Sequence, residues 1–180
     1  CGSDTGDIYF KNCRVPKWSL CGQLNKGLRI SLGTLDGARL VIAARAVGYA
    51  KGAYEKALDY ATQRIAFGKP LYKQEMIQEL LTDMEIKVQT TRQLLYKTLW
   101  MMDNDQPVQL ESAMLKRYGC KECFNVIDMA LQIYAGLGYT TEVRVGRLWA
   151  DARGNMFGGG THEIMAYICG RQVAKKYADA

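Results

Sequence analysis

The sequence predicts an all-α fold, an antiparallel up-down four-helix bundle preceded by a short N-terminal β and loop segment. Apolar residues recur at spacings of three, four and seven through three long segments, which is typical of amphipathic helices. The breaks between these segments are short and contain glycine, proline, aspartate or asparagine. Long helices joined by short breaks run antiparallel, and a terminal helix would supply the fourth member of the bundle.

The first 30 residues differ from the rest. Residues 8–15 have the composition of a strand, and Pro16 with Gly22 and Gly27 closes them off. The first residue is Cys1, and the opening residues have neither the charged start nor the apolar run of a signal peptide. We expect residues 1–30 to be the tail of an upstream β domain and residues 31–180 to form a C-terminal helical domain.

The first long helix is expected to begin at Asp36 and to end before Phe67. The second covers residues 77–102, and the third runs from about 108 to 134, where Gly136 and Gly138 end it. A shorter helix is expected around 143–152, and the last one over 161–177. The predicted apolar face of the first helix consists of Leu40, Ala44, Val47, Tyr54, Leu58 and Ala61, with Gly48 and Gly52 expected at a close helix contact.

Composition excludes several classes of protein. Charged or amide residues interrupt every long apolar segment, so we expect a soluble protein without a membrane span. The net charge of +6 is scattered along helical faces, which argues against a nucleic-acid partner. Of six cysteines only Cys120 and Cys123 are closely spaced, and His162 is the one histidine, so we predict no metal site. Buried reduced thiols are expected instead, which indicates a cytoplasmic protein.

Three glycine-bearing breaks lie at helix ends, at residues 64–70, 132–139 and 158–160. A glycine turn lets a bulky ligand approach the main chain, although a single run of glycines before Thr161 is typical of an ordinary helix start. Together the three breaks could form one shared site.

The order of these motifs resembles the C-terminal half of the acyl-CoA dehydrogenase flavoprotein family. The resemblance covers nearly the whole chain, because the motifs that carry it extend from Val15 to Ile164. They occur in the order and at the spacing of the family. They are the final β-domain strand with Val15, Pro16 and Gly22, the segment 36–39, Arg64-x-x-Phe67-Gly68-Lys69-Pro70, Asp83-Met84, the loop 132–138, Trp149-x-Asp151-Ala152-Arg153, and Gly160-Thr161-x-Glu163-Ile164.

This resemblance implies an FAD site shared between subunits and completed by the upstream β domain. Arg64 and Phe67 match residues that reach the FAD of the neighbouring protomer, as does the loop containing Gln132, Tyr134, Ala135 and Gly136. Thr161 and Glu163 match flavin-contacting positions, and Asp36 and Arg39 match the segment that lines the CoA part of the substrate. A guanidinium is also well suited to pyrophosphate oxygens. The alternatives are a helix-terminal charge for Arg64, an N-cap for Thr161 and a first-turn acid for Glu163.

The family's catalytic glutamate has no counterpart at its two usual places. Most members carry it just before the Gly-Thr pair, where this chain has Gly159, and a minority place it on the first helix, where Gly37 and Ala38 stand. Glycine and alanine cannot transfer protons. Asp36 is the nearest acid, and we interpret it as a helix cap. In addition, Glu75 stands where a flavin-contacting glutamine is expected, between Gln74 and Gln78, and Ala135 replaces a glycine.

The first functional hypothesis is an FAD-dependent oxidoreductase acting on the CH-CH group of an acyl-CoA, working as an enoyl-CoA reductase if the missing glutamate prevents dehydrogenation. The alternatives are a non-catalytic FAD- or acyl-CoA-binding subunit and a helical association module. The resemblance implies a homodimer or homotetramer, an electron-transfer flavoprotein as a partner, a role in fatty acid metabolism, and a cytoplasmic location, or the mitochondrial matrix in a eukaryote.

Overall fold

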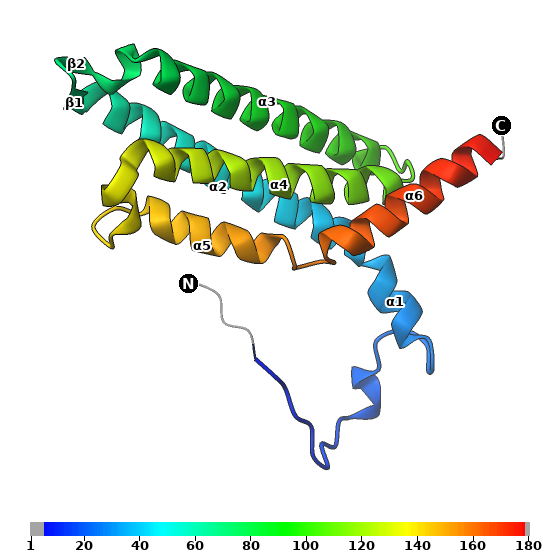
Figure 1. Ribbon diagram of the computed structural model, residues 1–180. Helices are drawn as coiled ribbons and strands as arrows, with labels where there is room; N and C mark the ends of the chain where they lie inside the picture. Colours follow the sequence, from blue (N-terminus) through cyan, green and yellow to red (C-terminus); the bar gives the residue numbers. More distant parts are fainter. Residues whose placement is uncertain (1–5, 179–180) are drawn as a thin grey trace.

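The computed structural model describes residues 6–178, and almost all of its regular structure is helical (Figure 1). A short helix α1 (Gly27–Gly33) leads into α2 (Leu35–Gln63), and α3 (Glu75–Asp103), α4 (Gln109–Tyr134), α5 (Val145–Asn155) and α6 (His162–Ala178) follow. A two-stranded antiparallel hairpin, β1 (Ile65–Ala66) and β2 (Lys69–Pro70), joins α2 to α3. Single 3-10 turns occupy Lys17–Ser19, Leu71–Lys73 and Ala135–Tyr139. The predicted all-α class is confirmed.

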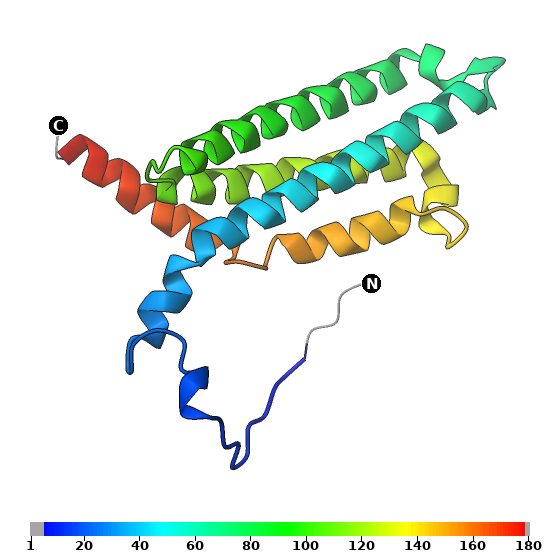
Figure 2. The same ribbon diagram turned by 180° about the vertical axis from the view of Figure 1, so that it is seen from behind.

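The helices α2, α3 and α4 lie side by side with alternating direction, as predicted (Figures 1 and 2). The fourth place in the bundle belongs to α5, which runs back along α2 and α4, and not to the terminal helix. Helix α6 packs on the first turns of α4 and then extends past the end of the bundle (Figure 1). Met165 is its one buried residue within the described part of the chain, so the apolar pattern of α6 is not used to fill this core.

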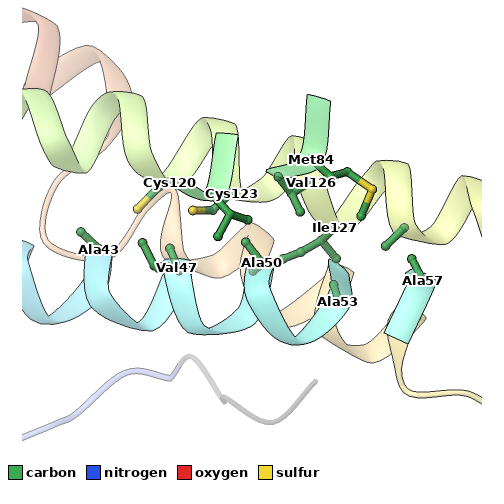
Figure 3. Close-up of a cluster of buried hydrophobic side chains, with 14 of the residues drawn as sticks. Ala43, Val47, Ala50, Ala53, Ala57, Met84, Cys120, Cys123, Val126 and Ile127 are labelled. Carbon is green, nitrogen blue, oxygen red and sulfur yellow. The ribbon is translucent and has the colours of Figure 1, made fainter. Parts of the chain in front are cut away.

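The centre of the core is an alanine-rich contact between α2 and α4 (Figure 3). Ala43, Ala50, Ala53 and Ala57 are fully buried and lie opposite the valine, isoleucine and cysteine side chains of α4. Side chains this small allow two helices to approach closely while the larger residues of α4 fill the space between them. Met84 of α3 closes one side of this cluster.

Part of the predicted face of α2 is wrong. Ala44 is exposed and Leu58 is 38 % exposed, whereas the neighbouring Ala43 and Ala57 are buried. Alanine occurs on both faces of this helix, so its apolar periodicity does not define one face. The predicted close contact is also misplaced: a Cβ at Gly48 or Gly52 would meet open space, and at Gly119 of α4 it would lie 2.9 Å from Cγ2 of Thr91.

Residues 8–15 do not form the predicted strand. A strand needs a neighbour to accept and donate its backbone hydrogen bonds, and nothing within residues 6–178 pairs with this segment. Its apolar side chains are exposed instead, including Ile8, Tyr9 and Phe10. The assignment of residues 1–30 to an upstream β domain remains a prediction.

None of the helices in the described part of the chain combines the length and the apolar character that crossing a membrane requires.

Candidate functional site

The predicted site residues lie in two groups at opposite ends of the bundle. Helices α2 and α4 run in the same direction, so the breaks at 64–70 and 132–138 share one end (Figures 1 and 2). The glycine turn at 158–160 follows α5, which runs back toward the start of α2. The eleven residues of α5 span about 16 Å. The expectation that the three breaks form one site is therefore wrong within a single chain.

At the first end, the hairpin turn presents Phe67 to solvent. Phe67 and Gly68 have φ angles of 52° and 77°, the pair of positive values that a type I′ turn requires. Glycine adopts this backbone conformation readily, but phenylalanine does so at a cost. The Phe67 side chain is 98 % exposed. A strained and fully exposed aromatic residue is well placed to contact another molecule.

Arg64 lies directly after the last turn of α2 and is also exposed. Its backbone carbonyl accepts a hydrogen bond from the amide of Leu71 at 2.9 Å, which closes the hairpin. Gln74 reinforces the same hairpin by donating its side-chain amide to the carbonyl of Ala66 at 3.2 Å. Gln74, which directly precedes Glu75, therefore stabilises the hairpin. The Arg64 side chain extends from a backbone that these hydrogen bonds hold in place.

The loop after α4 is held against α2 by a pair of tyrosines. The rings of Tyr60 and Tyr134 stack with centroids 4.3 Å apart, and the Tyr134 hydroxyl donates to the carbonyl of Lys56 at 3.0 Å. Ala135 then turns the chain with φ 51° and ψ −137°, a conformation that suits glycine. Gln132, Ala135 and Gly136 are exposed, so this loop lies open to solvent at the same end of the bundle as the Arg64 hairpin (Figure 1).

A groove of about 710 Å³ opens next to this loop. Trp149 of α5 forms part of its wall and donates its indole N–H to Asp128 of α4 at 2.8 Å. The groove continues past Tyr139, whose side chain is 89 % exposed. This end of the bundle therefore combines exposed aromatic side chains, a guanidinium and accessible backbone.

At the opposite end, two glycines of the turn have a backbone conformation that disfavours side chains. Gly159 and Gly160 have φ angles of 68° and 112°. A Cβ at Gly159 would lie 2.8 Å from Cδ1 of Ile42, and one at Gly160 would lie 2.6 Å from Cε of Met165. The position where most family members are expected to carry a glutamate is thus occupied by glycine in a conformation that favours glycine.

Asp36 and Arg39 form a network beneath this turn. Arg39 is 5 % exposed and donates from Nη1 to Oδ1 of Asp36 at 2.6 Å and from Nε to the carbonyl oxygen of Gly159 at 3.4 Å. Ser112 of α4 donates its hydroxyl to the same Asp36 oxygen at 2.9 Å. The interpretation of Asp36 as a helix cap is wrong, because Thr34 is at the N-cap and Asp36 lies in the first turn.

Thr161 caps α6, as one of the two sequence interpretations proposed. Its hydroxyl oxygen accepts a hydrogen bond from the amide of Ile164 at 3.4 Å. Glu163 is exposed in the first turn, and hydrogen bonds from its own backbone amide and from Thr161 lower the pKa of its carboxyl group. Both side chains lie at a helix N-terminus, where backbone amides favour an anionic group.

Sequence reasoning missed Lys116 of α4, whose side chain is fully buried. Its Nζ donates to the carbonyl oxygen of Met156, just before the glycine turn, at 3.4 Å. Burial lowers the pKa of Lys116. The sequence signal was its position one helical turn before Cys120, a thiol predicted to be buried, where a lysine is unusual.

The two closely spaced cysteines behave as predicted. Cys120 and Cys123 are buried and unpaired, and both belong to the core cluster shown in Figure 3. Burial raises the pKa of Cys123 to about 12. A thiol with this pKa is inert at neutral pH.

A family model described as "Acyl-CoA dehydrogenase, C-terminal domain" matches residues 25–174. The chain is 42 % identical over 173 residues to the probable acyl-CoA dehydrogenase YdiO of Escherichia coli, covering 96 % of this chain and 45 % of the relative. It is 36 % identical over 175 residues to the acryloyl-CoA reductase (NADH) of Anaerotignum propionicum, covering 97 % and 44 %.

The fold matches the butyryl-CoA dehydrogenase of Megasphaera elsdenii with a TM-score of 0.88 and 34 % identity. That match covers 92 % of this chain and 43 % of the solved chain. The chain thus spans less than half the length of the curated relatives that it matches.

Proposed function

Because the chain belongs to the acyl-CoA dehydrogenase family, we propose that it forms part of an FAD-dependent oxidoreductase that acts on the CH-CH group of an acyl-CoA thioester. The observation that carries this proposal is the end of the bundle with Arg64 and Phe67, where a guanidinium and an aromatic ring project from a fixed hairpin and where Gln132, Ala135 and Gly136 are also exposed. The activity belongs to the whole protein, to which this helical domain contributes one part.

The residues present at this end fit FAD. The exposed guanidinium of Arg64 can bind pyrophosphate oxygens, and the cofactor can approach the exposed Ala135 and Gly136 closely because their side chains are small or absent. Phe67 offers an apolar ring to an aromatic surface. FAD, when bound, would supply the hydride acceptor or donor of the reaction. The role of the protein residues is to bind the cofactor, orient it and exclude water.

A second copy of the chain completes the site in this proposal. The end with Arg64 and Phe67 and the end with Thr161 and Glu163 are separated along the bundle, so one flavin would meet the first end of one subunit and the second end of its partner. A homodimer or homotetramer satisfies this requirement. An electron-transfer flavoprotein is the proposed redox partner, because the reduced flavin must exchange two electrons with another molecule.

Reduction of an enoyl-CoA is the second candidate function. Dehydrogenation requires a base that removes the α-proton, and reduction requires an acid that returns it. Gly159 provides neither, so in reduction the hydride would come from the reduced flavin and the α-proton from water. Gly159 has a φ angle of 68°, a backbone conformation that favours glycine. A relative named acryloyl-CoA reductase agrees with this direction of reaction.

The experiment uses the intact protein reconstituted with FAD. A saturated acyl-CoA that bleaches the flavin supports dehydrogenation, whereas an enoyl-CoA that restores the colour of pre-reduced flavin supports reduction. If the protein binds FAD but responds to neither thioester, it is the non-catalytic binding subunit. If the protein takes up no FAD at all, both enzyme functions are excluded and the helical association module remains.

A further inference from the structure

The most unusual buried group in the described part of the chain is the Lys116 side chain. It is 0 % exposed, and none of the ion pairs among residues 6–178 involves it. An isolated ammonium is costly to bury, and a buried lysine normally has a carboxylate partner. Such a residue calls for an explanation in terms of what it holds in place.

Lys116 faces the segment that links α5 to α6. Its Nζ donates to the carbonyl oxygen of Met156, the residue after α5. Arg39, buried on α2, donates to the carbonyl oxygen of Gly159 in the same segment. Two side chains from two different helices therefore bind two carbonyl groups of one five-residue turn, residues 156–160.

We propose that Lys116 is a positioning residue of the glycine turn, and that with Arg39 it fixes residues 156–160 in the shape that the thioester substrate meets. The part of this inference that concerns the thioester rests on the proposed function. The part that concerns the turn rests on the hydrogen bonds alone.

The turn also makes hydrogen bonds through its own backbone amides, and the two side-chain anchors add to them. Within the turn, the amides of Phe157 and Gly158 both donate to the Gly154 carbonyl and the amide of Gly160 donates to Phe157, at 3.2 to 3.3 Å. Three glycines in sequence lose much conformational entropy when they are fixed. The groups that face Lys116 are Arg39 from α2, Cys120 from its own helix and His162 at the start of α6. Burial lowers the pKa of Lys116.

The test replaces the amine by an apolar group of similar length, Lys116→Met, and uses Lys121→Met on the exposed face of α4 as a control. Amide hydrogen exchange is measured by NMR on the whole chain. We expect the amides of Phe157, Gly158 and Gly160 to exchange about tenfold faster or more in Lys116→Met, with unchanged exchange in the core of α3 and in the control variant. If a buried amine merely fills space, the turn amides will keep their wild-type exchange rates, and this result would overturn the proposal.

Lys116→Met should fold, because methionine has a similar shape and its burial avoids the cost of burying an unpaired ammonium group. If it does not, Lys116→Leu serves as the second variant with the same readout. Loss of protection throughout α3 in both variants would show a general structural role and contradict a local one.

The link to the substrate is tested in the intact protein with FAD. Lys116→Met is expected to lower kcat/KM at least tenfold for the active thioester when measured at saturating FAD, because the turn lies against Arg39 of the segment proposed to line the substrate. Unchanged kcat/KM would remove Lys116 from the substrate side of the site. If the wild-type protein turns over neither thioester, the proposed function fails, whereas the hydrogen-exchange result still decides the role of Lys116 in the turn.

Discussion

Arg39 and Gly159 are 120 residues apart in the chain, yet the buried guanidinium of the first donates to the carbonyl oxygen of the second at 3.4 Å. This contact ties the start of α2 to the turn between α5 and α6. It also brings the segment expected to line CoA next to the place where the family's glutamate is expected. Gly159, which stands where the glutamate is expected, is therefore connected by hydrogen bonds to the proposed substrate-binding residues Asp36 and Arg39.

Gly159→Ala should destabilise the chain, because its φ of 68° disfavours any Cβ and Ile42 Cδ1 would lie 2.8 Å from that atom. We expect a loss of about 1–3 kcal/mol in the free energy of unfolding, measured by urea denaturation. Gly158→Ala is the matched control, since its φ is not positive and its Cβ would meet Ile42 at 3.5 Å, an ordinary contact. Equal losses in the two variants would contradict this account of the turn.

Ala135→Gly should stabilise the chain. Ala135 has φ 51° and ψ −137°, which glycine adopts without the steric cost that alanine meets. The expected gain is about 1 kcal/mol in thermal or chemical unfolding. Gly136→Ala, at a position with ordinary φ and open space around the new Cβ, should change stability much less. A loss of stability in Ala135→Gly would show that the strain assigned to Ala135 is absent.

Arg64→Ala is expected to weaken FAD binding at least tenfold in the intact protein while leaving its melting temperature unchanged. The Arg64 side chain is exposed, and substitutions of exposed residues away from special features change stability by about 0.5 kcal/mol or less. Lys69→Ala removes another exposed positive charge from the same hairpin and serves as the control. Flavin fluorescence titration measures both, and equal affinities in wild type and Arg64→Ala would remove Arg64 from the cofactor site.

Thiol reactivity should divide the cysteines into two groups. Cys13 and Cys21 are exposed and should be alkylated first, whereas Cys120 and Cys123 should react only when the chain unfolds. Mass spectrometry of the alkylated peptides provides the measurement. Rapid alkylation of Cys123 in the native chain at pH 8 would contradict its burial.

The same thiol makes stability depend on alkaline pH. The Cys123 pKa is about 12 in the folded chain and 9.0 as the reference value for an exposed thiol. Above pH 9 the unfolded chain releases this proton and the folded chain does not, so unfolding becomes more favourable as pH rises through this window. The contribution of Cys123 is fully present below pH 9. In Cys123→Ala the decline in unfolding free energy between pH 9 and 11 should be smaller than in wild type.

The long helices could be predicted because their signals are local and repeated. The second predicted helix, 77–102, lies within α3, and Gly136 and Gly138 correctly mark the end of α4. The face of α2 could not be predicted well, since the alanines that form its core contact carry little hydrophobic signal. The expected strand at 8–15 failed because strand formation depends on a partner that composition does not reveal.

The site residues show the same division. The motifs place Arg64 and Phe67 in a break between two helices and Thr161 at a helix start, which local sequence can indicate. The structure shows that the break is an exposed hairpin. The separation of the glycine turn from the other two breaks depends on the direction of α5, and the burial of Lys116 depends on packing between α4 and the α5–α6 turn. Contacts between elements distant in sequence have no local signature.

The most direct test of the proposed function is the visible absorbance of the intact, FAD-loaded protein when a CoA thioester is added without air. The account predicts that an enoyl-CoA reoxidises the reduced flavin, and that Arg64→Ala retains less FAD before the addition. A protein that binds no FAD, or whose flavin spectrum is unchanged by both saturated and unsaturated thioesters, would contradict it.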